Sequence, residues 1–305
     1  MTRREFLALA PAAVMSATAL PGSVLVHEHV MVDFIGADKI APGRYDSEEV
    51  FRSARPKLEA VKALGCVRLQ ECTPNFIGRD ARLMRRLSDA VGIEIWTNTG
   101  LYAAANHKYL PQFARTESAE QLARRWEEEW RRGVDGVKPR FIKIGVNKGP
   151  LHELDRKIVS AAALAAKETG LTVASHTGDG PAALEELEIF TGLGAKAGKF
   201  VWVHAQNEKD HAIHQRFAEA GGWVEFDGIR PQSLDWHAEC VRFMSGAGLL
   251  GRTLISQDAG WYHVGEPGGG NYRGYELIFT DLLPRLEAPA RTQLMVDNPR
   301  AAFGS

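Results

Sequence analysis

The 305-residue chain has few cysteines, and the three that it has, Cys66, Cys72 and Cys240, are scattered. They form no paired spacing of the kind that binds structural zinc or builds a disulfide framework, so both kinds of scaffold are excluded. The chain also lacks an excess of either charge, since 37 Lys and Arg face 38 Asp and Glu. Without a basic run, nucleic acid is excluded as a partner.

Long apolar runs and low-complexity linkers are missing as well. No stretch of about 18 apolar residues, the length that spans a bilayer, occurs in the chain. A disordered chain is also excluded, because 45% of the residues are hydrophobic and the net charge is close to zero. The length allows two medium-sized domains or one large α/β barrel.

The first residues have the layout of an export signal. Arg3 and Arg4 precede a short apolar run, residues 6–14, which is followed by small residues. The arginine pair resembles the twin-arginine signal, which is an address read by the export machinery. We therefore expect residues 1–19 to be an export signal and the protein to be periplasmic or otherwise exported. The alternative is a cytoplasmic protein with a frayed N-terminus.

The rest of the chain alternates between β-rich and helical segments. Predicted strands cover residues 24–32, 67–72, 93–99, 141–146, 171–175, 200–203, 223–226 and 253–256. Predicted helices cover residues 48–64, 81–91, 119–132, 154–169, 181–193, 210–220, 234–247 and 272–286. Eight strands and eight helices in strict order predict an α/β fold, a single (β/α)8 TIM barrel over residues 20–305. An open doubly wound sheet is the alternative, but it usually carries a Gly-rich phosphate loop after its first strand.

Polar side chains stand at the carboxyl ends of the predicted strands, which is where the chemistry of a barrel sits. His27 and His29 end the first strand and point to the same side, because side chains alternate along a strand. Lys143 lies within the apolar fourth strand, where its charge is costly unless it is paired or removed. Later strand ends carry His176, His204 and Asp258. Any one of these could be a hydrogen-bonded core residue, but together they indicate a metal site.

This set of six resembles the amidohydrolase superfamily, and specifically its phosphotriesterase-related branch, in which a carboxylated lysine bridges two metal ions. The resemblance covers about residues 23–305 and includes residues 78–80, 99–102, 165–170, 225–227 and 298–303. The chain departs from the family after the sixth strand, where Gln206 replaces the acid that commonly follows the histidine. The orientation of His204 depends on that neighbour.

The resemblance implies two divalent metal ions, expected to be Zn²⁺, with cobalt and manganese as alternatives. His27, His29 and Asp258 would hold the buried ion, and His176 and His204 the more exposed one. Lys143 would bridge both ions after reacting with CO₂. A metal-bridged hydroxide would then attack a lactone or another ester, with Asp258 as its proton acceptor. Lys143 and Asp258 are thus the predicted catalytic residues.

Candidates for substrate binding are Tyr102, Arg230 and Trp261. A structural role for the tyrosine and a surface position for the arginine are the alternatives. His211 and His214, three residues apart on a predicted helix, are expected on an exposed helix face.

The leading hypothesis is an exported metal-dependent hydrolase of a small ester or lactone. One alternative is an amidohydrolase or phosphodiesterase on the same barrel, and another is a metal-containing envelope binding protein without turnover. A homodimer is the oligomer that the resemblance implies.

Overall fold

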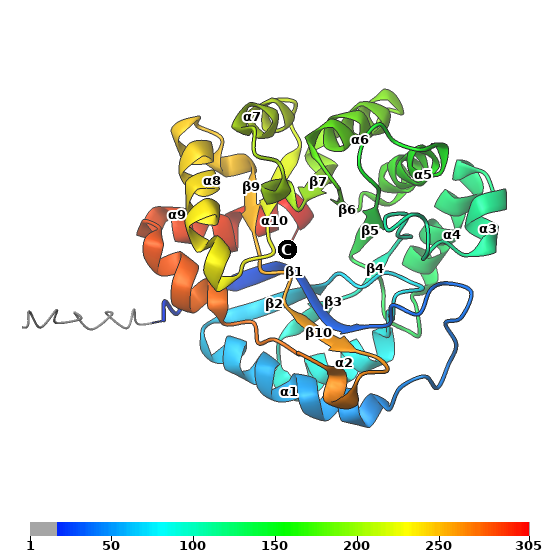
Figure 1. Ribbon diagram of the computed structural model, residues 1–305, viewed down its shortest axis with the longest axis horizontal. Coiled ribbons are helices and arrows are strands. Elements are labelled where there is room, and N and C mark those ends of the chain that lie inside the picture. Colours follow the sequence, from blue (N-terminus) through cyan, green and yellow to red (C-terminus); the bar gives the residue numbers. More distant parts are fainter. Residues whose placement is uncertain (1–16, 305) are drawn as a thin grey trace, which may run out of the picture.

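The computed structural model describes residues 17–304. Most of the predicted export signal, residues 1–16, lies outside this part. The described residues form a ring of parallel strands with the helices outside it, as Figure 1 shows. The predicted barrel fold is confirmed.

Ten strands are present in residues 17–304, and they form two sheets with the orders β10-β1-β2-β3 and β4-β5-β6-β7-β8-β9. Their bounds are β1 (Ser23–Val32), β2 (Cys66–Glu71), β3 (Glu94–Trp96), β4 (Asn98–Thr99), β5 (Phe141–Gly145), β6 (Val173–His176), β7 (Phe200–Val203), β8 (Trp223–Phe226), β9 (Thr253–Ile255) and β10 (Gly260–His263). β3 and β4 are one predicted strand, interrupted at Thr97. The ring closes between β9 and β1, where Asp258 N donates to His27 O at 3.1 Å.

The helices cover the outside of the ring, except for the last one, which lies across one end of the barrel. They are α1 (Ser47–Ala63), α2 (Ala81–Val91), α3 (Gln112–Thr116), α4 (Ala119–Arg132), α5 (Glu153–Thr169), α6 (Gly180–Gly192), α7 (His211–Glu219), α8 (Leu234–Gly246), α9 (Ala288–Thr292) and α10 (Asn298–Phe303). Side-chain oxygens of Asp46, Asp80 and Asp179 accept backbone N–H bonds at the starts of α1, α2 and α6. None of the helices in the described part is long and apolar enough to cross a membrane.

The barrel interior is apolar at the end where the strands begin. Alternate residues of the strands fill it together with the C-terminal helix, and the main members are Val24, Val26, Phe141, Ala174, Val201, Leu254, Ala302 and Phe303. Helix α10 thus closes the end of the barrel opposite the strand carboxyl ends, and only the latter end is open to a ligand.

The side chains of β1 switch faces just before its two histidines, because the strand has an irregularity there. Its pairing with β2 shifts between Leu25 and Glu28, where β1 contains one extra residue. Val26 lies in the interior cluster, and after the shift His27 and His29 face the cavity. Plain alternation starting from Val26 would have turned both histidines away from the interior.

Two predictions about the C-terminal part are wrong. The predicted helix 272–286 starts only near Ile278, as a π-helical turn, Ile278–Leu282, followed by a 3₁₀ turn, Leu283–Arg285. Residues 272–276 are not helical, and one of their backbone groups bonds to β10, with Arg273 N donating to Gly260 O at 3.0 Å. β10 was not predicted as a strand, and it pairs in parallel with the upper half of β1.

Candidate metal centre

All six predicted metal ligands line one cavity of about 100 Å³ at the carboxyl ends of the strands. Tyr102 and Trp261 line the same cavity. Arg230 is not among the lining residues, so the structure does not bring the third predicted substrate contact to the cavity wall.

His27 and His29 face Asp258 across the cavity floor. The Nε2 atom of His29 lies 3.3 Å from Asp258 Oδ1, and Nε2 of His27 lies 3.8 Å from the same oxygen. Asp258 Oδ1 is buried and has no hydrogen-bond partner in the described structure. A buried anionic oxygen without a donor is costly, and a cation between these three atoms would remove that cost. The three residues therefore fit a divalent ion.

His176 and His204 form the other half of the cavity. Their ring centroids lie 4.4 Å apart. Burial lowers the pKa of His176 well below its usual value and lowers the pKa of His29 to about 4. These two rings are therefore neutral near pH 7, which is the form that binds a metal ion.

Lys143, on β5, lines the cavity together with the four histidines and is 2% exposed. Its Nζ atom donates to Ile144 O at 3.2 Å, and it makes no ion pair with a carboxylate within residues 17–304. Burial lowers the pKa of Lys143, which favours the neutral amine.

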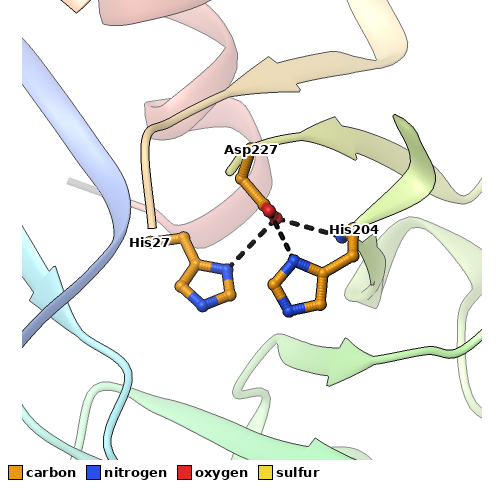
Figure 2. Close-up of side chains that lie close together, drawn as sticks. All are labelled: His27, His204 and Asp227. Atoms are coloured by element: carbon orange, nitrogen blue, oxygen red, sulfur yellow. Dashed lines mark hydrogen bonds and ion pairs between the residues drawn. The ribbon is translucent and has the colours of Figure 1, made fainter. Parts of the chain in front are cut away.

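Asp227, at the end of β8, links two of these histidines (Figure 2). Its carboxylate accepts from His204 Nδ1 at 2.5 Å and lies 3.3 Å from His27 Nδ1. Burial alone would raise the pKa of Asp227, but His204 and His27 outweigh it and hold this pKa well below its usual range. Because Asp227 occupies the Nδ1 side of both rings, their Nε2 atoms remain free for a metal.

Gln206 supports this arrangement. Its Nε2 donates to Asp227 Oδ1 at 3.0 Å, and its Oε1 accepts from Asp227 N at 3.0 Å. The acid beside His204 therefore comes from β8, and Gln206 holds the backbone and carboxylate of that acid. The departure from the family sequence does not leave the His204 ring without a carboxylate.

Two further buried acids, Glu225 and Glu71, stand behind the β1 histidines, and neither has a predicted role. Glu225 Oε1 lies 3.0 Å from His27 Nδ1. Thr73 Oγ1 lies 2.8 Å from His29 Nδ1 and donates to Glu71 Oε1 at 2.5 Å. The signal for Glu225 was present, since an acid inside an apolar strand end is unusual without a function or a partner. Glu71 ends the buried strand β2 and carries the same signal, whereas Thr73, which follows that strand, carries none.

Aromatic side chains form the mouth of the cavity. The Tyr102 ring lies 5.0 Å from the His176 ring and the Trp261 ring 4.5 Å from that of His29, measured between centroids. Phe34 packs on Trp261 with centroids 5.6 Å apart. A substrate would therefore meet apolar surfaces directly above the polar floor.

A (β/α)8 barrel with this donor set at its strand ends defines a metal-dependent hydrolase. A family model described as Phosphotriesterase family matches residues 8–303. The chain belongs to the phosphotriesterase family.

Individual relatives are similar over most of the chain. The phosphotriesterase homology protein of Escherichia coli strain K12 is 26% identical over 283 residues, 90% of this chain and 94% of that protein. N-acetyltaurine hydrolase of Homo sapiens is 27% identical over 264 residues, 78% of this chain and 73% of that protein. Among solved structures, a mutant PTE-like lactonase of Deinococcus radiodurans has a TM-score of 0.83 at 25% identity and covers 95% of this chain and 98% of its own.

Proposed function

We propose that the protein is a binuclear metal-dependent hydrolase of small esters, with lactones as the leading substrate class. The observation that carries the proposal is Asp258 Oδ1, which has no hydrogen-bond partner in the described part of the chain and is buried opposite the Nε2 atoms of His27 and His29. His27, His29 and Asp258 would hold one ion, and His176 and His204 the other. Zn²⁺ suits the four imidazoles. When bound, the ions would lower the pKa of water and polarise the substrate oxygen.

Lys143 would become the ligand shared by both ions. Its neutral Nζ attacks the carbon of CO₂, forms an N–C bond and releases one proton, which leaves a carbamate anion. The buried position without an acidic partner supports this conversion, because a neutral amine is required and a cation there would be unpaired.

Asp258 would move the proton of the reaction. If Oδ1 binds the ion, the other carboxylate oxygen, Oδ2, remains to accept a proton from the attacking water and pass it to the leaving group. Tyr102, Trp261 and Phe34 would orient the substrate by covering its apolar part. A cavity of about 100 Å³ favours a small substrate.

Asp258→Asn tests the chemistry separately from metal binding. The amide keeps one oxygen near both histidines but is a poor proton acceptor, so we expect turnover to fall by about 10²- to 10⁴-fold while most of the metal stays bound. Metal content by plasma mass spectrometry and initial rates on lactones, aryl esters and organophosphates are the measurements. Asp235→Asn is the matched control, because that side chain is 98% exposed on α8.

Three results would contradict the proposed function or favour one of its alternatives. Fewer than about one ion per chain after expression with zinc and bicarbonate would contradict the binuclear site. Two ions without hydrolysis of any ester would favour a binding protein. Faster hydrolysis of N-acyl amides than of esters would favour the amidohydrolase alternative.

A further inference from the structure

Glu28, the residue between the two β1 histidines, points away from the cavity and is fully buried. Its Oε1 accepts from Ser256 Oγ at 2.8 Å and from Gln257 N at 3.0 Å. Its Oε2 accepts from Ala259 N at 2.7 Å. All three donors belong to the segment that carries Asp258, and they lie on both sides of it.

Asp258 needs such support because its backbone is unfavourable. Its φ angle is +48°, in the left-handed region that residues other than glycine rarely adopt. This conformation turns the chain from β9 toward β10 and aims the Asp258 carboxylate at His27 and His29. By fixing the neighbouring residues 257 and 259, Glu28 holds the turn in the one conformation in which the carboxylate reaches the histidines.

Glu186, on α6, likewise accepts hydrogen bonds from the residues on both sides of a proposed ligand, His176. Its two carboxylate oxygens accept from Ser175 Oγ and from Thr177 Oγ1, the latter at 2.6 Å. These hydroxyls belong to the residues on either side of His176. Glu186 is fully buried and comes from a helix outside the barrel. It therefore fixes the end of β6 from behind, without touching the imidazole.

We infer that Glu28 and Glu186 are positioning residues, each of which orients one metal ligand through hydrogen bonds from the residues on both sides of that ligand. The inference rests on the proposed binuclear site. Glu28 acts on Asp258 and hence on the ion held with His27 and His29. Glu186 acts on His176 and hence on the ion held with His204. The two acids should therefore control the affinities of two different sites.

The test is a Zn²⁺ titration of the metal-free protein in competition with a chromophoric chelator. Glu28→Gln keeps the volume but places an NH₂ group against N–H or O–H donors. We expect this variant to weaken one of the two Zn²⁺ sites about 10- to 100-fold and to leave the other near its wild-type affinity. Glu186→Gln should weaken the opposite site by a similar factor. Combining Glu28→Gln with His29→Ala should add little loss at the first site, because both changes act on the same ion.

Asp155→Asn is the control for burial of a carboxylate. Asp155 is fully buried but contacts Asn147 and His107 rather than neighbours of a ligand, so both Zn²⁺ affinities should stay unchanged. If either glutamine variant fails to fold by circular dichroism, Ser256→Ala and Thr177→Val each remove one donor and should weaken the corresponding site about 2- to 10-fold.

The outcomes separate the inference from the proposed function. Wild-type protein that binds fewer than two ions would contradict the binuclear site itself. Wild-type protein that binds two ions, with variants that lose thermal stability but keep both affinities, would overturn the positioning role. Equal weakening of both sites by Glu28→Gln would overturn its assignment to a single ion.

Discussion

His214 is a buried histidine outside the metal centre, and its lowered pKa makes the stability of the protein depend on pH. On α7 its Nε2 lies 2.8 Å from Ala205 O, and its Nδ1 lies 3.1 Å from Nδ1 of His211. Burial lowers the pKa of His214 from 6.5 to about 4. The expectation of an exposed helix face is therefore wrong for His214, because the side chain packs against Trp202 and Phe226 of the barrel.

The lowered pKa of His214 predicts acid destabilisation. The unfolded chain binds a proton at this histidine below about pH 6.5, whereas the folded protein resists it until about pH 4. Stability is therefore fully present above pH 6.5 and falls as the pH drops, by up to about 3 kcal/mol from this residue. His214→Gln, which can still donate to Ala205 O, should lose less stability between pH 7 and pH 5 than wild type. Urea unfolding at both pH values measures the difference, and equal losses would refute it.

The six cavity residues were recognisable from sequence because each is a single polar group at the end of an apolar strand. Asp227 and Gln206 were not assigned their joint role, because it depends on contact between the ends of β7 and β8. Arg230 was expected near the substrate because it follows β8. The structure instead places it outside the cavity wall, and its Nη1 atom is buried without a partner among residues 17–304.

At the scale of elements, the segment that follows β4 packs so closely on the last residue of β5, Gly145, that this position has no room for a side chain. A Cβ built on Gly145 would lie 2.6 Å from ring carbons of Tyr102. Tyr102 is held there by a parallel bridge to Gly145, which places its ring beside His176.

Gly145→Ala should therefore push the Tyr102 ring out of place. We expect a loss of about 1–3 kcal/mol in the free energy of unfolding and a raised KM for an ester substrate. Gly192→Ala, at the end of α6 with no atom within 4 Å of the added carbon, is the matched control and should be neutral or slightly stabilising. A Gly145→Ala protein with wild-type stability and KM would show that Tyr102 can shift without consequence.

The order of the elements was predictable from sequence, but their exact pairing was not. The alternation of apolar runs gave the eight barrel strands, because each must bury both faces. The extra residue in β1 is set by pairing with β2, and β10 exists only because its backbone finds the upper part of β1. Neither the extra residue in β1 nor the strand β10 produces a periodic apolar pattern that could be read from the sequence.

At the scale of the whole molecule, metal binding should contribute to folding stability. The proposed ligands come from β1, β5, β6 and the segments that follow β7 and β9, so an ion would tie both sheets together. Free zinc at 1,000 times its Kd would stabilise the fold by about 4 kcal/mol per site. We expect chelation to lower the melting temperature by at least about 5 °C. Differential scanning fluorimetry with and without EDTA checks this, and His29→Ala should shrink the shift.

We also propose that the protein is exported through the twin-arginine route, on the basis of Arg3 and Arg4. Changing both to lysine should keep a tagged protein in the cytoplasm, where fractionation and immunoblotting would find it. Export that is unaffected by this change would contradict the proposal.

Trp261 and Phe34, two of the aromatic residues at the cavity mouth, differ in how directly a substitution would affect the proposed metal ligands. Trp261 belongs to β10, which pairs with the strand that carries His29, and its Nε1 donates to Asp258 O at 2.9 Å. Phe34 follows the end of β1 and is fixed by an exposed lysine, since Lys108 Nζ donates to its carbonyl at 2.6 Å. A change at Trp261 acts directly on two proposed ligands, whereas Phe34 contacts neither ligand ring and reaches His29 only through Trp261. Substrate range in this enzyme can therefore evolve, or be engineered, from the Phe34 side while the catalytic floor stays intact.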